Sequence, residues 1–241
     1  DENIAKKIVD YVPQESHSVL EIGPGTGVLS KYLLKMDIEN YLAVDIDLES
    51  IDFLKAHYPA DAEKFVYADF LKLNLMDIFP GKITVIGNFP YNISTQILFR
   101  IIEQRTQVTE VIGMFQKEVA ERICSGPGTK KYGIPSVLIQ SYFDVEYLFT
   151  VNENVFSPPP KVKSAVIRIS RNKTEKLNCD ESLFFQLVKT GFNQRRKTLR
   201  NSLKSFGITE NEWITELFNK RAEQLTVSDF ELLAQQAMQN N

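Results

Sequence analysis

The sequence is poor in the side chains that bind transition metals. It holds two histidines, His17 and His57, and two cysteines, Cys124 and Cys179, among 241 residues. The cysteines are too far apart for a metal-knuckle pattern, and no cluster of Cys and His is present of the kind that zinc sites use. We therefore do not expect a metalloenzyme.

The chain also lacks long apolar runs and a signal peptide. No apolar stretch reaches the roughly 20 residues of a membrane-spanning helix, and no charged-then-apolar leader opens the chain. With 43% hydrophobic and 24% charged residues, the composition is typical of a globular protein. We therefore predict a cytoplasmic protein. The chain begins with Asp rather than Met, so we also expect that a segment upstream is missing.

Cations are not in excess overall, but they gather near the C-terminus. The formal net charge of −3 argues against a uniformly basic nucleic-acid binder. Residues 1–170 carry 17 basic and 22 acidic side chains, residues 171–241 carry 11 and 9, and residues 189–204 hold six basic residues and no acid. This segment favours a phosphate-contact surface, although a solvated helix face is the usual explanation for the row Arg196, Arg200 and Lys204.

Strands and helices alternate over the first part of the chain. Short β-branched runs that end at Gly or a polar residue predict strands at 18–22, 41–46, 64–68, 83–87 and 110–115. Helices are predicted at 3–12, 28–36, 47–58, 95–103, 117–124 and from 134, and a last strand pair at 145–151 and 162–169. This order predicts an α/β fold with a Rossmann-like, parallel-dominated sheet and an antiparallel tail.

The last part of the chain contains no strand pattern. Residues 172–181 are polar and predict a linker, and helices are predicted at 182–192, 196–206, 210–218 and 227–238. Two helix starts have capping-box spacing, Thr209 with Glu212 and Thr226 with Asp229. We therefore predict an α/β domain over residues 1–171 and a small all-helical domain over residues 182–241.

Glycines and acids follow the first three predicted strands. The segment Glu21–Gly27 contains three glycines, which let a ligand approach the backbone closely. A pyrophosphate-binding fingerprint would need Gly where Val28 stands, so a nucleoside cofactor is favoured. Asp45 is placed to bind ribose hydroxyls, and Asp69 to accept a hydrogen bond from an adenine amino group. Each acid alone can instead be a helix cap, and Glu21 points either at the cofactor or at a backbone N–H.

The fourth predicted strand runs directly into Asn88-Phe89-Pro90-Tyr91. Ligands of open α/β sheets lie beyond the carboxyl ends of the strands, and Pro90 stiffens the turn because its φ is fixed. The turn therefore presents an amide oxygen and a backbone carbonyl beside an aromatic ring. This set suits a planar substrate with an amino group. The plainer alternative is a strand-to-helix turn with Asn88 as a cap.

These motifs, in this order, resemble those of class I S-adenosylmethionine-dependent methyltransferases. The Asn-x-Pro-Tyr turn resembles that of the subset that methylates exocyclic amines of bases. The stretches Gln116–Arg122, Val155–Val166 and Gly191–Leu199 are similar to the small-subunit ribosomal RNA adenine dimethyltransferases, the kasugamycin-sensitivity methyltransferase family. The likeness covers nearly the whole chain. Phe89 stands where this family usually has Leu.

The resemblance implies an activity and its partners. Methyl groups would pass from S-adenosylmethionine to the exocyclic amines of two adjacent adenines near the 3′ end of small-subunit rRNA, met in the assembling small ribosomal subunit by a monomeric enzyme. Two alternatives stay open: a large-subunit rRNA adenine methyltransferase of the antibiotic-resistance type, and a non-catalytic assembly or RNA-binding factor on the same fold. The family's Gln-x-Phe-Leu segment would precede Asp1, so full activity is expected to need that segment.

The resemblance also implies roles for individual residues. Asn88 and the Pro90 carbonyl would hold the target amine, and Tyr91 and Phe156 would stack on the adenine. The predicted cofactor contacts are Glu21, Gly23, Gly25, Gly27, Asp45, Ile46, Asp69, Phe70 and Asn88. The predicted RNA contacts are Arg195, Arg196, Lys197, Arg200 and Lys204.

Overall fold

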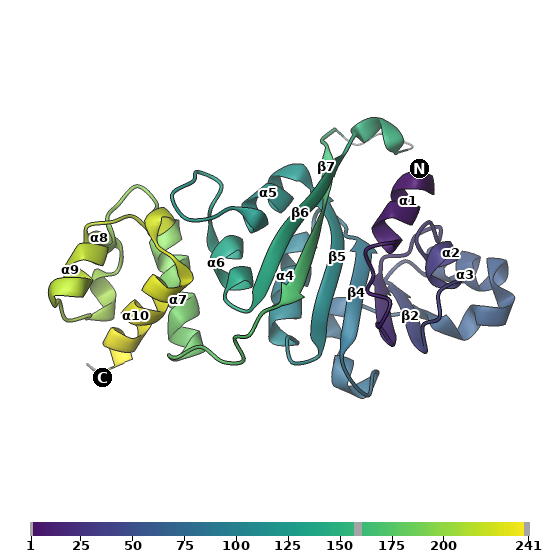
Figure 1. The fold of residues 1–241 in the computed structure, drawn as a ribbon, viewed down its shortest axis with the longest axis horizontal. Helices are drawn as coiled ribbons and strands as arrows, with labels where there is room; N and C mark the ends of the chain where they lie inside the picture. The colour runs from purple at the N-terminus through teal and green to yellow at the C-terminus, as the bar shows by residue number, and fades with distance from the viewer. Residues whose placement is uncertain (1, 157–160, 239–241) are drawn as a thin grey trace. The chain divides into compact units, whose positions relative to one another are not determined.

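Strand β1 (Ser18–Ile22) lies inside a mixed sheet whose order is β3-β2-β1-β4-β5-β7-β6 (Figure 1). The computed structural model describes residues 2–156 and 161–238, and within these the sheet has seven strands. The others are β2 (Asn40–Asp45), β3 (Phe65–Tyr67), β4 (Ile83–Asn88), β5 (Val108–Gln116), β6 (Phe143–Val151) and β7 (Ser164–Arg171). The predicted α/β fold with an antiparallel tail is confirmed.

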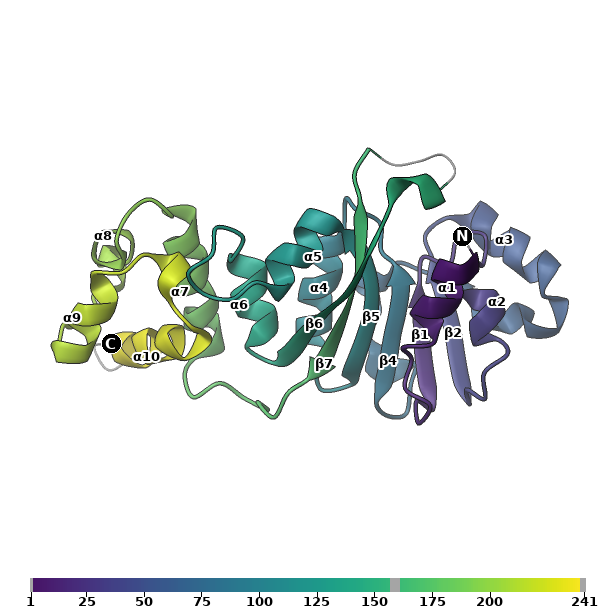
Figure 2. The ribbon, with the colours of Figure 1, turned by 45° about the horizontal axis from the view of Figure 1, so that its top comes forward.

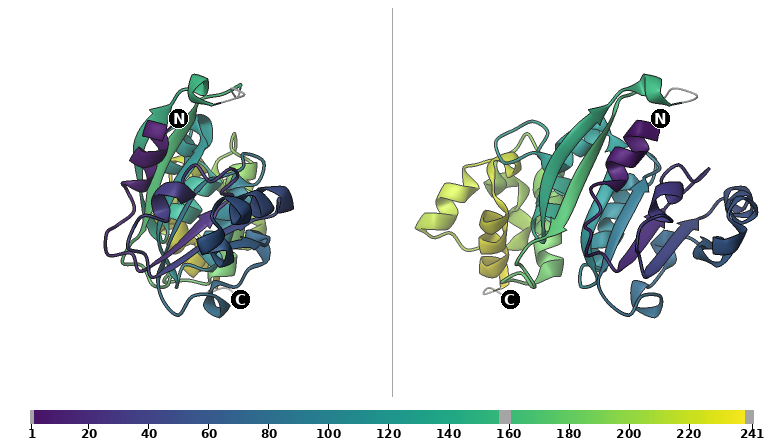
Figure 3. Two further views of the ribbon diagram at one scale, coloured as in Figure 1. Left: turned by 90° about the vertical axis from the view of Figure 1, so that its right-hand side faces the viewer. Right: turned by 45° about the vertical axis from the view of Figure 1, so that its right-hand side comes forward.

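Strands β1 to β5 pair in parallel, and β7 pairs antiparallel with β5. All five residues of β1 and the first five of β4 are buried, as expected for parallel strands covered on both faces. The long strands β6 and β7 lie side by side at the end of the sheet (Figure 3). Residues 157–160, which include three consecutive prolines, lie outside the described residues.

Helices cover both faces of the sheet. The first four are α1 (Glu2–Val9), α2 (Ser30–Leu33), α3 (Leu48–His57) and α4 (Ser94–Glu103). Buried side chains of α1, α2 and α3, such as Ile8, Leu33 and Leu54, share one core cluster with the sheet. In Figure 2, α1 lies in front of the sheet and α4 behind it. The predicted helix at 28–36 is shorter, because the turn that follows the glycines continues to Leu29.

A pair of glycines makes room for the ring of Phe89. Gly87 on β4 lies opposite Gly113 on β5. A Cβ atom at Gly87 would stand 2.8 Å from the Phe89 ring, and one at Gly113 would stand 2.5 Å from it. Phe89 is 1% exposed and packs edge-to-face against Phe115, with 5.0 Å between the ring centroids. The buried ring of Phe89 therefore fixes the residue after Asn88 against strands β4 and β5.

The chain forms two compact units. One contains the residues up to 120 together with 145–171, and the other combines 121–144 with the residues from 172 onward. Helix α5 (Lys117–Cys124) ends in the second unit, and α6 (Ile134–Gln140) belongs to it. An internal segment thus joins the C-terminal helices in one structural unit.

The C-terminal helices are α7 (Glu181–Asn193), α8 (Leu199–Ser202), α9 (Glu212–Phe218) and α10 (Val227–Met238). The predicted helix at 196–206 is wrong. Residues 194–197 form a turn, α8 is short, and a 3₁₀ turn follows at Lys204–Phe206. The Leu199 N–H donates to the carbonyl of Lys220 (2.8 Å), which it could not do inside a continuous helix.

The two predicted capping boxes have different outcomes. At α10, the Thr226 N–H donates to Asp229 (2.8 Å) and the Asp229 N–H donates to the Thr226 hydroxyl (3.2 Å), so this box is confirmed. At α9, the N-cap is Asn211, whose side chain accepts a hydrogen bond from the Ile214 N–H (3.0 Å). The predicted cap at Thr209 is therefore wrong by two residues.

Candidate active site

A turn of glycines follows β1 at the carboxyl edge of the sheet. Gly23, Gly25 and Gly27 have φ angles of 68°, 54° and 82°, a region that favours glycine. A Cβ atom at Gly27 would also stand 2.7 Å from the Leu54 side chain, whereas no atom lies within 4 Å of one placed at Gly25. The turn therefore needs glycine for its backbone and leaves open space beside Gly25.

Asp45 ends β2 beside this turn. Its Oδ1 atom accepts a hydrogen bond from the Asp47 N–H (3.0 Å), and Oδ2 lies 3.4 Å from the Gly25 nitrogen, which donates to it. The side chain of the next residue, Ile46, is 62% exposed. The fold thus brings the glycines and the predicted ribose acid together, although Asp45 lies 18 residues after Gly27 in sequence.

Asp69 starts a 3₁₀ turn after β3. Its Oδ1 atom accepts a hydrogen bond from the Leu71 N–H (3.0 Å), and Oδ2 lies 3.4 Å from the Lys72 ammonium. This is the helix-cap geometry of the simpler alternative, and its predicted role toward adenine stays a prediction. The Phe70 side chain is buried, so contact between this residue and a ligand would have to come from its backbone.

Glu21 lies within strand β1 and not beyond the carboxyl end of that strand. The residue is 1% exposed, and its carboxyl group accepts hydrogen bonds from the hydroxyls of Ser30 (2.8 Å) and Tyr41 (2.5 Å). Burial raises the pKa of Glu21 from its ordinary value of 4.5 to about 7. The sequence prediction named a cofactor or a backbone N–H as its partner and missed both hydroxyls. A charged residue in a buried strand was the available signal, because such a group needs buried donors.

Asn88 and Phe156 line one pocket of about 230 Å³. The other lining residues are Ile4, Ala5, Ile8, Val28, Leu29, Met114 and Val155. Asn88 is exposed at the end of β4, and Phe156 is partly buried against the core cluster. Among the described residues that line it, the pocket therefore combines apolar walls with the Asn88 amide, which suits a flat ring that carries an amino group.

The rest of the turn is held by the protein itself. The Tyr91 hydroxyl lies 2.6 Å from that of Ser164, the first residue of β7. The Pro90 carbonyl accepts a hydrogen bond from the Ile93 N–H (3.2 Å), which leaves one lone pair for another donor. Tyr91 is not among the described lining residues of the pocket, so its predicted stacking role stays a prediction.

Comparison with known proteins decides the family. The sequence model for "Ribosomal RNA adenine dimethylase" matches residues 1–238. The chain belongs to this dimethylase family. It is 54% identical over 232 residues to ribosomal RNA small subunit methyltransferase A of Cytophaga hutchinsonii, a match that covers 95% of this chain and 90% of the relative. The corresponding protein of Flavobacterium johnsoniae is 53% identical over 237 residues, with 98% and 90% covered.

Solved structures share the fold of the dimethylase. A dimethyladenosine transferase from Plasmodium falciparum superposes with a TM-score of 0.80 at 26% identity, covering 97% of this chain and 94% of the other. The 23S rRNA methyltransferase ErmE superposes with a TM-score of 0.75 at 20% identity, with 98% of each chain covered. The second likeness concerns the fold alone.

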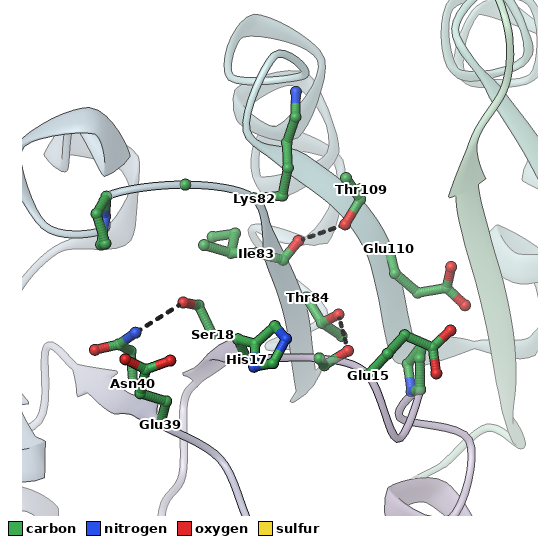
Figure 4. A pocket seen from close by; sticks show the side chains of 14 residues that line it. Glu15, His17, Ser18, Glu39, Asn40, Lys82, Ile83, Thr84, Thr109 and Glu110 are labelled. Carbon is green, nitrogen blue, oxygen red and sulfur yellow. Dashed lines mark hydrogen bonds between the residues drawn. The ribbon is translucent and has the colours of Figure 1, made fainter.

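A larger pocket of about 560 Å³ lies at the opposite edge of the dimethylase sheet (Figure 4). Its residues precede or begin β1, β2, β4 and β5, so it faces the amino ends of the strands. Several of its polar groups bond to one another: the hydroxyls of Ser16 and Thr84 are 2.8 Å apart, and Asn40 donates to Ser18 (3.3 Å). Ligands of such folds bind at carboxyl ends, so the smaller pocket at Asn88 is the candidate site.

The five predicted RNA contacts of the dimethylase have different surroundings. Arg195 pairs with Glu223 (2.5 Å between Nε and Oε2), and Arg200 pairs with Glu210. Arg196, Lys197 and Lys204 are exposed. The predicted helical row of cations is wrong, because Arg196 lies in the turn before α8.

Within the described part of the chain, residues 2–156 and 161–238, no group of three or more His, Cys, Asp or Glu side chains is arranged to hold a metal ion. No helix in that part of the chain has both the length and the apolar character that crossing a membrane requires.

Proposed function

We propose that this dimethylase transfers methyl groups from S-adenosylmethionine to the exocyclic amines of two adjacent adenines near the 3′ end of small-subunit rRNA. The observation that carries the proposal is the pocket at the end of β4, where the Asn88 amide stands among apolar side chains. Relatives more than 50% identical are named for the small subunit. The substrate would be the assembling subunit, met in the cytoplasm by a monomer.

The carboxyl edge of the sheet suits S-adenosylmethionine. Open space beside Gly25 gives a ligand access to the backbone of the glycine turn. The Asp45 carboxylate would accept hydrogen bonds from the ribose hydroxyls, and that of Asp69 would accept one from the adenine amine. When bound, this cofactor supplies an electrophilic methyl group on a sulfonium.

The turn would prepare the target amine for attack. An adenine amine is a weak nucleophile because its lone pair is delocalised into the ring. The Asn88 amide oxygen and the remaining lone pair of the Pro90 carbonyl can accept its two hydrogens, hold them out of the ring plane and thereby localise the lone pair on the nitrogen. Holding the amine in this geometry converts the reaction into a near-unimolecular step. The proton that the nitrogen carries after transfer leaves to solvent.

The target adenine has to leave its stack to reach the pocket. Flipping a base costs a few kcal/mol, and stacking on an aromatic ring returns about 1–3 kcal/mol per base. Phe156 lines the pocket with Asn88 and would provide that ring. Residues 1–171 would thus carry out the chemistry, and residues 182–241 would contact RNA phosphates through Arg196, Lys197 and Lys204.

Methyl transfer to defined RNA substrates tests the proposal. The full-length protein would be incubated with labelled S-adenosylmethionine and naked small-subunit rRNA, immature subunits or mature subunits, and the modified base would be identified by mass spectrometry. We expect N6,N6-dimethyladenine at two adjacent positions, with immature subunits as the best substrate. Modification of large-subunit rRNA alone would support the antibiotic-resistance alternative. Binding to subunits without methyl transfer would support the non-catalytic factor.

A further inference from the structure

The buried carboxyl group of Glu21 is not explained by contact with a ligand. In the sheet, Glu21 lies opposite Ala43 of β2 and Ile86 of β4, and it is 1% exposed. A buried carboxyl is unfavourable unless donors satisfy it, and apolar side chains would fill such a place at lower cost. Its presence points to a role that an apolar residue could not fill.

The two donors to Glu21 come from different sides of the glycine turn. Glu21 precedes Gly23 by two residues, and Ser30 follows Gly27 by three. One carboxylate oxygen, Oε2, accepts hydrogen bonds from the hydroxyls of both Ser30 and Tyr41. The Ser30 side chain is fully buried, and Tyr41 is 6% exposed. A single atom therefore ties the two ends of the turn to each other and to β2.

The same strand, β2, also carries the predicted ribose acid. Tyr41 and Asp45 are four residues apart on β2 and lie on the same face, because side chains alternate along a strand. The rim of the glycine turn is tied to this strand as well, since Gly23 donates to the Val44 carbonyl (2.9 Å) and Gly25 to Asp45 (3.4 Å). The hydrogen bonds Tyr41–Glu21, Gly23–Val44 and Gly25–Asp45 thus connect β1 and the glycine turn to β2.

We propose that Tyr41 and Ser30 are positioning residues for the cofactor, acting through Glu21. Their hydroxyls hold the glycine turn at a fixed distance from Asp45, so that one ligand can reach both. This inference rests on the proposed binding of S-adenosylmethionine. It assigns to Tyr41 and Ser30 an effect on cofactor affinity and none on the methyl-transfer step itself.

The test removes one hydroxyl at a time. Tyr41→Phe keeps the ring and loses the hydrogen bond to Glu21. We expect the affinity for S-adenosylmethionine, measured by calorimetry, to fall about tenfold, as expected when a buried polar group loses one of its hydrogen-bond partners. KM for the cofactor should rise to a similar extent, with kcat at saturating cofactor unchanged. Ser30→Ala should have the same effect, and Ser30→Thr, which keeps a hydroxyl, should restore affinity.

Tyr147→Phe is the matched control. Its hydroxyl lies 2.7 Å from that of Thr150 on the exposed part of β6, so the variant loses the same chemical group at a place without contact to the glycine turn. Its cofactor affinity should equal that of the parent. If Tyr41→Phe does not fold, the comparison of Ser30→Ala with Ser30→Thr decides.

Two outcomes would overturn the inference, and they are distinguishable. A lowered melting temperature with unchanged cofactor affinity in both Tyr41→Phe and Ser30→Ala would make the network merely structural while leaving the proposed function in place. A parent protein that does not bind S-adenosylmethionine at all would contradict the proposed function and this inference together.

Discussion

Arg195 donates a hydrogen bond from Nη2 to the backbone carbonyl of Lys130, 2.6 Å away. Its Nε pairs with Glu223, and the backbone carbonyl of Glu223 in turn accepts the Gly128 N–H (2.7 Å). Arg195 therefore fastens the loop around residues 126–131 within the second unit. These bonds engage the Nε and Nη2 atoms of Arg195, whereas its neighbours Arg196 and Lys197 are exposed. The predicted phosphate contact of Arg195 stays a prediction.

The salt dependence of RNA binding should separate these neighbours. In the double variant Arg196→Ala, Lys197→Ala, the slope of log affinity against log salt should become shallower by about 1.4–1.8 units if both side chains neutralise phosphates. Arg195→Ala should leave the slope nearly unchanged and lower the melting temperature, because it releases the loop. Titrations at several salt concentrations would measure both. If Arg195→Ala made the salt-dependence slope shallower to the same extent, Arg195 would also be a phosphate contact.

Asn88→Ala should lower turnover and leave stability and RNA affinity intact. Its proposed hydrogen bond to the amine acts mainly in the transition state, and loss of one such group costs about 10²–10³-fold in rate. Single-turnover methylation, thermal melts and RNA binding would measure the three quantities. Asn92→Ala is the control, since Asn92 is an exposed amide four residues later. A lowered melting temperature with near-normal turnover would mean that Asn88 only caps the turn.

Asp69→Ala should weaken S-adenosylmethionine binding by about 1–3 kcal/mol, the range for a polar partner left unsatisfied. Loss of its cap on Leu71 should also cost about 1 kcal/mol of stability. Asn74→Ala removes a similar cap from the next 3₁₀ turn, where Asn74 accepts a hydrogen bond from Met76. Calorimetry should show weaker cofactor binding in Asp69→Ala but not in Asn74→Ala. Equal cofactor affinities of the two variants would mean that Asp69 does not contact the cofactor.

Glu21 should make stability depend on pH near neutrality. Burial raises the pKa of Glu21 from 4.5 to about 7, so between these values the folded chain binds this proton more tightly than the unfolded chain does. The free energy of unfolding should therefore fall as pH rises from 4.5 to 7, by roughly 3 kcal/mol from this group at about 1.4 kcal/mol per pH unit. Glu21→Gln should remove this part of the slope in denaturant unfolding. Parallel pH profiles for the two proteins would contradict the assignment.

Phe89 and Gly113 should be energetically coupled. A methyl group at position 113 would collide with the Phe89 ring, so Gly113→Ala should destabilise the fold by about 1–3 kcal/mol through overpacking. Phe89→Leu removes the contact with that ring but leaves the contact with the Phe115 ring, which would also be 2.5 Å away. The double variant should therefore recover part of the lost stability and be more stable than the sum of the single effects predicts. Urea unfolding of the four proteins measures the coupling. If the stability effects of the two substitutions simply added, the Phe89 ring would be able to move aside at no cost in free energy.

Local sequence was sufficient to predict an element where the structure of a segment depends only on its own residues. The predicted strand Ser18–Ile22 agrees with the structure at both ends, because its apolar run stops at Gly23. The turn at Asn88 and the glycines after β1 were also found from sequence, since each directly follows a strand. Helix 196–206 was wrong because a distant carbonyl, that of Lys220, binds the Leu199 N–H and starts α8 there.

Local sequence could not predict which side chains from distant segments form hydrogen bonds with one another. The hydrogen bond from Tyr41 to Glu21 depends on how β1 and β2 are aligned. The role of Arg195 depends on carbonyls some 65 residues earlier in the chain. In both cases the residue type was informative, but its partner was fixed only by tertiary packing.

The ring of Phe89 above Gly113 also constrains how this protein can diverge. Among relatives, a bulky residue at position 113 should occur together with a smaller one at position 89. The order of change matters too, because enlarging position 113 first produces a steric clash with the rings of both Phe89 and Phe115, whereas shrinking position 89 first removes one of these clashes and leaves only a small cavity. Lineages should therefore pass through the small–small combination, so that the residue type next to Asn88 depends on which substitution has occurred at position 113 in the neighbouring strand.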